Sequence, residues 1–239
     1  MKKTLILLAG YPGTGKSYMA NIIIKNFPEL RLLSPDDIKE KFWDKYGFDT
    51  LEQKEELIVR AWNTYYDEME QDFLHGKSLI SDYPFSLKQK PTLEKLTKQY
   101  GYQVCTIRLI GQIEVLFERQ KQRDLDDSRH WGHILTSYHR SDSKIERKNA
   151  DNLLDYTEFY KRCTQRGYGE FDLGDTIEVD VSDYEKIEYP KILQWLEDRV
   201  WKNRGILILL FFASFNLSIM DSLLWANIKQ AIIKETHWS

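Results

Sequence analysis

Five short apolar runs, each bounded by turn residues, alternate along the chain with longer stretches in which apolar side chains repeat at helical spacing. A parallel strand that is covered by helices on both faces reads as such a run, because neither face meets water. The alternation therefore predicts an α/β fold, with a parallel sheet of about five strands and helices on both faces of the sheet. The predicted strands cover Thr4–Ala9, Leu30–Leu33, Ser78–Ser81, Gln103–Ile110 and Thr176–Val181.

The stretches between these runs carry the helical pattern. The longest one covers residues 36–75 and is rich in charged and aromatic side chains. Its apolar members recur three or four positions apart, which places them on one helix face, so we interpret them as core residues and not as a cofactor site. They are Ile58, Ala61, Trp62, Tyr65, Met69 and Phe73, and further helices are predicted over Leu87–Tyr100, Ile113–Arg123 and Tyr184–Val200.

The composition changes abruptly after Arg204. We expect residues 1–204 to form one α/β domain and residues 205–239 to form an apolar C-terminal helical extension. The segment 205–228 is about long enough to span a bilayer, which takes ~20 residues. Asp221 lies inside it, and an aspartate at the membrane centre costs roughly 2.5–3.5 kcal/mol. Membrane contact, packing against the domain and binding of a partner therefore all stay open for this segment.

Composition and charge narrow the class of protein. The chain has 239 residues and a formal net charge of -3, with 42% hydrophobic and 30% charged residues. These values are typical of a folded protein. Because the net charge is negative, the chain has no overall positive field that would favour duplex nucleic acid as a partner. Cys105 and Cys163 have no metal-binding spacing, so we expect reduced, buried thiols and a cytoplasmic protein. The short apolar run at the N-terminus is interpreted as a strand and not as a signal sequence.

The strongest motif is the sequence GYPGTGKS at residues 10–17, which directly follows the first predicted strand. It contains three glycines, a lysine and a serine. Glycines allow a backbone to approach phosphate groups closely, while a lysine supplies a cation and a following hydroxyl can bind Mg²⁺. The helix that comes next turns its positive end toward the anion. The motif therefore predicts that the chain binds a nucleoside triphosphate, ATP with Mg²⁺. It matches G-x-x-x-x-G-K-[ST] without a mismatch at Gly10, Tyr11, Pro12, Gly13, Thr14, Gly15, Lys16 and Ser17.

A second polar element, Ser34-Pro35-Asp36-Asp37, follows the second predicted strand. It can be a helix start, with Ser34 as N-cap, Pro35 at the first helical position and Asp37 closing a capping box. It can also be chemical, because ligands of doubly wound sheets bind beyond the carboxyl ends of the strands. A carboxylate beside the triphosphate could orient an acceptor hydroxyl and take its proton. Both interpretations stay open.

Taken together, these elements resemble P-loop kinases of the polynucleotide-kinase and zeta-toxin type. The similarity covers residues 1 to about 200. It implies a P-loop NTPase fold and transfer of the γ-phosphoryl group of ATP to a hydroxyl. The elements that carry it are GYPGTGKS, SPDDIK, the strand end LISDYPFS and the arginines Arg119, Arg123 and Arg129.

The resemblance implies roles for the residues after the second strand. Polynucleotide kinases carry an Asn-Arg-Asp-Asp-x-Arg string whose first aspartate is the general base, a role that falls on Asp36 here. The final arginine, which helps to hold substrate phosphate, corresponds to Lys39, and Asp37 is expected to lie beside the substrate. Pro35 replaces the first arginine, and Lys39 keeps the positive charge but loses bidentate geometry. A small molecule or a nucleotide, and not a polynucleotide end, is therefore the expected acceptor.

The resemblance also implies a metal site and a lid. Asp82, at the end of the third strand, takes the position of an acidic residue near magnesium, with Ser17 as the second ligand. The alternative is an aspartate that begins a turn. The three arginines correspond to a mobile lid that stabilises the transferred phosphoryl group, with Arg119 and Arg123 as catalytic residues and Arg129 as a substrate contact. Salt bridges to neighbouring acids are the alternative for them.

Two other functions stay open beside a metabolic kinase. One is a nucleotide-dependent switch or adaptor that the C-terminal segment holds at a membrane, although the chain has no Asn-Lys-x-Asp guanine-binding motif. The other is a kinase of nucleotide sugars, similar to a zeta toxin. His130, His133 and His139 do not have persuasive metal-binding spacing, and we interpret them as part of a polar loop or as substrate contacts.

Overall fold

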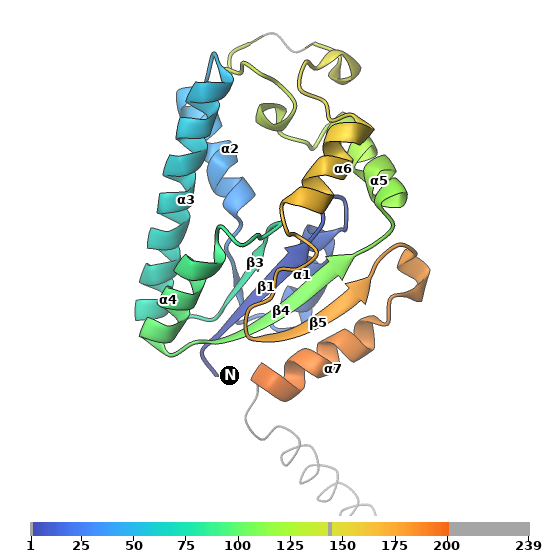
Figure 1. Cartoon of the computed structure of the whole chain (residues 1–239). Coiled ribbons are helices and arrows are strands. Elements are labelled where there is room, and N and C mark those ends of the chain that lie inside the picture. The colour runs from blue at the N-terminus through green and yellow to red at the C-terminus, as the bar shows by residue number, and fades with distance from the viewer. Residues whose placement is uncertain (1, 143–144, 201–239) are drawn as a thin grey trace, which may run out of the picture.

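The computed structural model describes residues 2–142 and 145–200, whose arrangement is shown in Figure 1. In this part of the chain, five parallel strands form a single sheet with the order β2-β3-β1-β4-β5. The predicted α/β class and parallel sheet are confirmed, and each predicted strand agrees with an observed one within one or two residues. The strands are β1 (Thr4–Gly10), β2 (Arg31–Leu32), β3 (Leu79–Asp82), β4 (Gln103–Ile110) and β5 (Asp175–Asp180).

Helices connect the strands and cover both faces of the sheet. They are α1 (Lys16–Asn26), α2 (Pro35–Tyr46), α3 (Leu51–Leu74), α4 (Lys90–Tyr100), α5 (Ile113–Leu125), α6 (Tyr156–Gln165) and α7 (Tyr189–Val200), with short 3-10 turns η1 (Trp131–His133), η2 (Arg147–Asn149) and η3 (Tyr184–Lys186).

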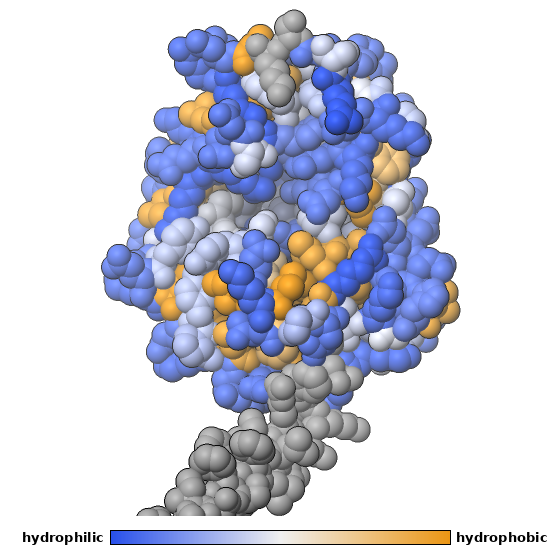
Figure 2. All heavy atoms as spheres, turned by 180° about the vertical axis from the view of Figure 1, so that it is seen from behind, coloured by the Kyte–Doolittle hydropathy of each residue, from blue (hydrophilic) through white to orange (hydrophobic). Residues whose placement is uncertain are grey.

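The central strand β1 divides the core into two layers. All seven of its residues are buried, and successive side chains point to opposite faces. Leu5, Leu7 and Ala9 pack on the side of α2, α3 and α4. Ile6 and Leu8 pack on the side of α1, α5, α6 and α7. Figure 2 shows the molecule from behind, where the largest group of hydrophobic residues lies in the lower half and the upper half is mostly hydrophilic.

Parallel pairing brings the carboxyl ends of three neighbouring strands to one edge of the sheet. Leu8 of β1 lies opposite Asp82 of β3, and Gly10 lies opposite Leu109 of β4. β2 pairs with the other side of β3 and leads directly into α2. Residues that are far apart in the sequence therefore meet at this edge, where ligands of open α/β sheets bind.

The helical stretch predicted over residues 36–75 consists of two helices. Gly47 ends α2 with φ 66°, and the Thr50 hydroxyl accepts a hydrogen bond from Gln53 N to begin α3. The core interpretation of this stretch is confirmed, because Ala61, Tyr65, Met69 and Phe73 are buried and Trp62 is partly buried against them. Ile58 is partly buried in a separate cluster with Trp43, Phe48, Leu57 and Tyr138.

Two local details differ from the prediction. Ser34 is the N-cap of α2 and Pro35 its first residue, but the Ser34 side chain makes no capping hydrogen bond, so the predicted capping box does not form. Helix α6 was not predicted, because only Phe159 and Cys163 of its residues are buried and two positions give no clear periodicity. Cys163 and Cys105 are both buried free thiols, as expected.

The C-terminal segment lies outside the described residues, and so does its predicted membrane contact through residues 205–228. None of the helices in residues 2–142 and 145–200 is long and apolar enough to cross a membrane. The boundary between a domain of residues 1–204 and an extension of residues 205–239 stays a prediction.

We expect a fragment of residues 1–204 to fold and to bind ATP by itself. Helix α7 buries Ile192, Leu196 and Val200 against the sheet, so a cut after residue 204 keeps all of these contacts. Thermal unfolding of the fragment and of the full chain should agree within about 4 °C, the shift that 1 kcal/mol produces in a domain of this size. A matched fragment that ends at residue 188 loses α7 and should not fold. A 1–204 fragment that aggregates, or that melts more than ~10 °C lower, would contradict the boundary.

Candidate active site

The phosphate-binding loop connects β1 to α1 through three glycines in the left-handed region of backbone space. Gly10, Gly13 and Gly15 have φ values of 104°, 77° and 79°. A side chain on Gly10 or Gly13 would also overlap a backbone carbonyl, of Leu109 or Leu116 respectively. The loop conformation therefore requires glycine at these positions. Helix α1 begins directly after the loop, so its unpaired N–H groups lie where an anion would bind.

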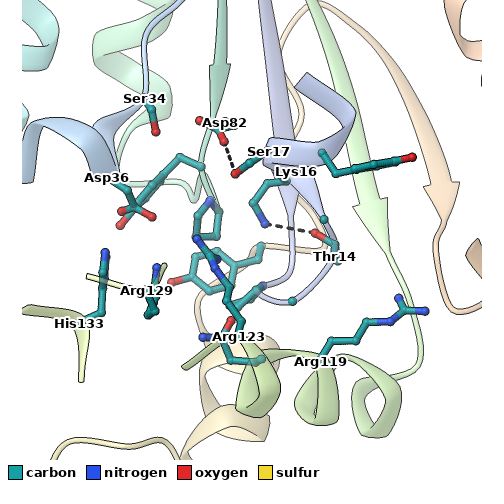
Figure 3. Close-up of a pocket in the computed structure, with 18 of the residues that line it drawn as sticks. Thr14, Lys16, Ser17, Ser34, Asp36, Asp82, Arg119, Arg123, Arg129 and His133 are labelled. Atoms are coloured by element: carbon teal, nitrogen blue, oxygen red, sulfur yellow. Dashed lines mark hydrogen bonds between the residues drawn. The ribbon is translucent and has the colours of Figure 1, made fainter. Parts of the chain in front are cut away.

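Lys16 lies inside the loop. Its Nζ donates hydrogen bonds to the carbonyls of Tyr11 (2.6 Å) and Gly10 (3.3 Å) and to the hydroxyl of Thr14 (3.2 Å, Figure 3). Burial, together with the positive charge of Arg123, lowers the pKa of Lys16 to about 7. A polyanion at this position would favour the charged form again and raise that pKa.

Ser17 and Asp82 form the candidate metal site. The Ser17 hydroxyl donates a hydrogen bond to Asp82 Oδ2 at 2.6 Å (Figure 3). The other carboxylate oxygen, Oδ1, is buried without a hydrogen-bond partner in the described part of the chain, and burial raises the pKa of Asp82. A hard cation would satisfy this oxygen, so the residues present fit Mg²⁺.

The metal site needs oxygen atoms from outside the protein. Within the described ranges, no group of three or more His, Cys, Asp or Glu side chains could hold a metal ion. Mg²⁺ usually keeps several water ligands and binds through one or two protein groups together with substrate phosphates. The Ser17–Asp82 pair suits a metal that arrives with a nucleotide.

Asp36 lies at the first turn of α2, and Lys39 neutralises its charge. Lys39 Nζ is 3.1 Å from Asp36 Oδ1 and donates a hydrogen bond to the Tyr83 hydroxyl at 2.9 Å. Burial would raise the pKa of Asp36, but the charges of Lys39 and Arg129 outweigh burial and hold this pKa well below its usual range. Asp36 is therefore ionised at any physiological pH.

The three predicted lid arginines separate into two groups. Arg119 donates hydrogen bonds to the carbonyls of Val181 (2.6 Å) and Ser182 (2.9 Å), and its guanidinium lies 3.7 Å from the centre of the Tyr184 ring. Figure 3 shows it pointing away from Asp36, whereas Arg123 and Arg129 lie on the Asp36 side of the cavity. Arg129 forms an ion pair with Asp124 at 3.3 Å, and both side chains are nearly buried.

One cavity of about 620 Å³ brings the predicted residues together. Gly10 and Tyr11 lie at the base of the loop and not in its lining. The sequence pattern missed several lining residues, since they follow no motif; only Glu40, one helical turn after Asp36, could have been found by periodicity. The predicted lining residues are Pro12, Gly13, Thr14, Gly15, Lys16, Ser17, Asp36, Asp37, Lys39, Asp82, Arg119, Arg123 and Arg129, and the missed ones include Glu40, Arg162, Arg166, Tyr168 and Tyr184.

A protein-family model described as an AAA domain matches residues 5–140, more than half of the chain. The chain belongs to this AAA domain family. The match includes the phosphate-binding loop, Asp36, Asp82 and the three arginines, so all of the predicted site lies within the matched part of this AAA domain.

Solved structures support the same fold for this AAA domain. It is similar to a protein assigned as a kinase from Chloroflexus aurantiacus J-10-fl, with a TM-score of 0.66 and 24% sequence identity over 84% of this chain and 100% of that chain. Likeness at this identity shows the fold, which is that of the P-loop kinases, and the predicted resemblance to this group is confirmed.

Two further likenesses are too weak to support an argument. A tunicamycin resistance protein from Deinococcus radiodurans has a TM-score of 0.44 and 12% identity over 82% of this chain and 95% of that chain. A gluconokinase from Sinorhizobium meliloti 1021 has a TM-score of 0.40 and 14% identity over 80% of this chain and 88% of that chain. Among curated proteins, none matches this AAA domain.

Binding of ATP should be coupled to proton uptake by Lys16. With its pKa lowered to about 7, Lys16 is mostly neutral at pH 8, and the phosphates should restore its charge. Calorimetric titration with Mg-ATP at pH 8, in two buffers of different ionisation enthalpy, should show uptake of about one proton per ATP, and much less at pH 6. Lys16→Met should bind ATP at least about tenfold more weakly and without this uptake. Equal uptake by the wild type and Lys16→Met would assign the proton to another group.

Proposed function

We propose that this protein is an ATP-dependent kinase, which transfers the γ-phosphoryl group of ATP to a hydroxyl group of a small molecule or nucleotide. One observation carries the proposal: the loop that contains Lys16 and the ionised carboxylate of Asp36 line the same cavity, although they follow different strands. The loop supports binding of the nucleotide, and the carboxylate provides a place for the hydroxyl that attacks it.

In this proposal the triphosphate lies along residues 12–17, with its γ-phosphate toward Asp36. Mg²⁺ would be held by Ser17 and Asp82, and it would neutralise part of the phosphate charge when bound. The base of the nucleotide would lie toward Arg119 and Tyr184, because the γ-phosphate lies toward Asp36 at the other end. The Tyr184 hydroxyl is only 3.0 Å from a Cβ atom placed on Gly15. The Arg119–Tyr184 pair thus borders the phosphate-binding loop on the side away from Asp36.

The transfer step needs little covalent chemistry from the protein. Asp36 accepts a hydrogen bond from the acceptor hydroxyl. This bond orients the hydroxyl oxygen toward the γ-phosphorus. Lys16, Arg123 and Arg129 are cations that stabilise the charge that spreads over the transferred group. Because Arg119 is bound to two backbone carbonyls, we assign it to nucleotide binding and the transfer role to the other two arginines.

The contacts of Lys39 favour a small acceptor over a polynucleotide end. The resemblance suggested Lys39 as a ligand for substrate phosphate. Its ammonium group is instead buried between Asp36 and the Tyr83 hydroxyl, with the Tyr83 ring centre 4.1 Å away. It is therefore engaged in orienting Asp36, and a cavity of about 620 Å³ suits ATP together with one small molecule. We propose no role for duplex nucleic acid.

A screen with γ-labelled ATP should identify an acceptor. Hydroxyl-bearing metabolites, nucleotides and nucleic-acid ends are incubated with the full-length protein, and we expect label on one class of small hydroxyl compound. Asp36→Asn should lower transfer by about 10²-fold or more, because the acceptor hydroxyl loses the carboxylate that orients it, while ATP affinity changes only a few-fold.

Asp37→Asn is the matched control, because Asp37 lies one position further on the same helix turn, whereas the ion pair with Lys39 is made by Asp36. It should keep most of the activity. Unchanged turnover in Asp36→Asn would remove Asp36 from the mechanism. Hydrolysis of ATP by the wild type with no labelled acceptor in any class would favour a nucleotide-dependent switch.

Removal of the Asp82 carboxylate should act through Mg²⁺. Asp82→Asn keeps the size of the side chain but loses the charge that binds the metal. The Mg²⁺ concentration for half-maximal turnover should rise by about 10–100-fold, with a smaller change at saturating Mg²⁺. An unchanged Mg²⁺ requirement would show that Asp82 only begins the turn at Tyr83.

A further inference from the structure

Glu40 and His133 form a hydrogen-bonded pair in the active-site cavity. Glu40 follows Asp36 by one turn of α2, so both side chains project from the same helix face. His133 comes from η1, 93 positions later in the chain, and its Nε2 lies 2.7 Å from Glu40 Oε1. The His133 side chain is 12% exposed and that of Glu40 32%, and both residues line the cavity.

The surroundings of this pair move the two groups away from their ordinary protonation behaviour. Burial raises the pKa of Glu40 to about 7, and repulsion from Asp36 adds to this. Burial and the charge of Arg129 lower the pKa of His133 well below its usual range, so the ring is neutral. A neutral ring whose Nε2 faces an ionised carboxylate carries its proton on that nitrogen, so the Nε2–H group donates a hydrogen bond to Glu40. The charged groups that face Glu40 are Asp36 and Asp37 on its own helix, Arg123 on α5, and Arg129 between α5 and η1.

The two carboxylates of this helix face therefore differ in character. Lys39 forms an ion pair with Asp36 and keeps it ionised, while Glu40 pairs with His133. Within residues 2–142 and 145–200, no lysine or arginine lies at ion-pair distance from Glu40. Figure 3 shows Asp36, Arg129 and His133 grouped at one end of the cavity, across from Lys16. Two carboxylates whose surroundings separate their proton affinities mark a division of acid–base roles.

We propose that Glu40, oriented by His133, receives the proton that the acceptor hydroxyl loses, while Asp36 remains ionised and orients that hydroxyl. The inference rests on the proposed kinase function. In the step, the bond between the acceptor oxygen and the γ-phosphorus forms, and the bond from that phosphorus to the bridging oxygen breaks. The electron pair of the broken bond leaves with ADP. The hydroxyl proton moves to a Glu40 oxygen, directly or through one water, and then to solvent.

Separate groups can orient the hydroxyl and accept its proton because the transition state of phosphoryl transfer is loose. The hydroxyl loses its proton late, so the group that orients it needs only a hydrogen-bond acceptor. The group that finally holds the proton works best when its proton affinity matches the working pH. Asp36 meets the first requirement, and Glu40 meets the second.

Hydrolysis of Mg-ATP by the full-length protein, with water as the acceptor, tests the division of roles from pH 5 to 9. The wild-type turnover should rise with pH through an apparent pKa near 7, because Glu40 must be ionised to accept a proton. Glu40→Gln should lose this rise and be slowed by about 10²-fold or more at pH 8. Asp36→Asn should be slower at every pH and keep the rise, with its midpoint moved to lower pH because a negative charge beside Glu40 is gone. Glu29→Gln, a change at an exposed glutamate outside the cavity, should resemble the wild type.

A Glu40→Gln protein whose turnover still rises through pH 7 would overturn the inference while leaving the kinase function in place. Failure of the kinase function would look different, with no labelled acceptor in any class, whether or not the wild type hydrolyses ATP. A thermal measurement decides the inference in that case.

Because the pKa of Glu40 is raised in the folded protein, its ionised form destabilises the fold, and this loss of stability grows as the pH rises from about 4.5 to about 7. Glu40→Gln should therefore raise the melting temperature by at least about 3 °C at pH 8 and by less at pH 5. A pH-independent difference, or none, would contradict a proton-accepting Glu40.

Discussion

A lysine ammonium group that lies half-buried at the carboxyl end of the central strand is the feature on which the rest of the site depends. Lys16 can lie there because three glycines with positive φ fold the loop back over it and turn carbonyl oxygens toward it. The parallel order of the sheet then places the ends of β3 and β2 beside this cation. Asp82 and Asp36 reach one cavity with Lys16 for that reason, and not through any local sequence relation.

Burial perturbs these groups in ways that a nucleotide and a metal would correct. The pKa of Lys16 is lowered and that of Asp82 is raised, which means that burial disfavours the charged form of both side chains. Phosphate oxygens would stabilise the ammonium, and a divalent cation would stabilise the carboxylate. Asp36 differs, because Lys39 keeps it ionised without a ligand. The Asp36 end of the cavity can therefore accept a hydrogen bond from a hydroxyl without further help. At the other end, Lys16 and Asp82 need phosphate oxygens and a divalent cation to stabilise their charges.

The sequence carries the parts of the site that depend on local chemistry. The loop motif, the five strands and the amphipathic α3 follow from glycine geometry and hydrophobic spacing, and the structure agrees with them. Contacts between distant segments could not be predicted. Three histidines pair with carboxylates that lie about 90 positions earlier in the chain, and no spacing rule links the partners. The pairs are His133–Glu40, His130–Asp44 and His139–Asp49. The same holds for Arg119, whose carbonyl partners lie after β5.

An equilibrium titration can show whether the loop around Lys16 binds the phosphates of a nucleotide. Full-length protein is titrated with Mg-ATP and with adenosine, which share the base and sugar but not the phosphates. We expect saturable binding of Mg-ATP that is at least about 100-fold tighter than that of adenosine, the equivalent of one or two charge-assisted hydrogen bonds. Equal affinities, or no saturable binding of Mg-ATP to folded protein, would contradict it.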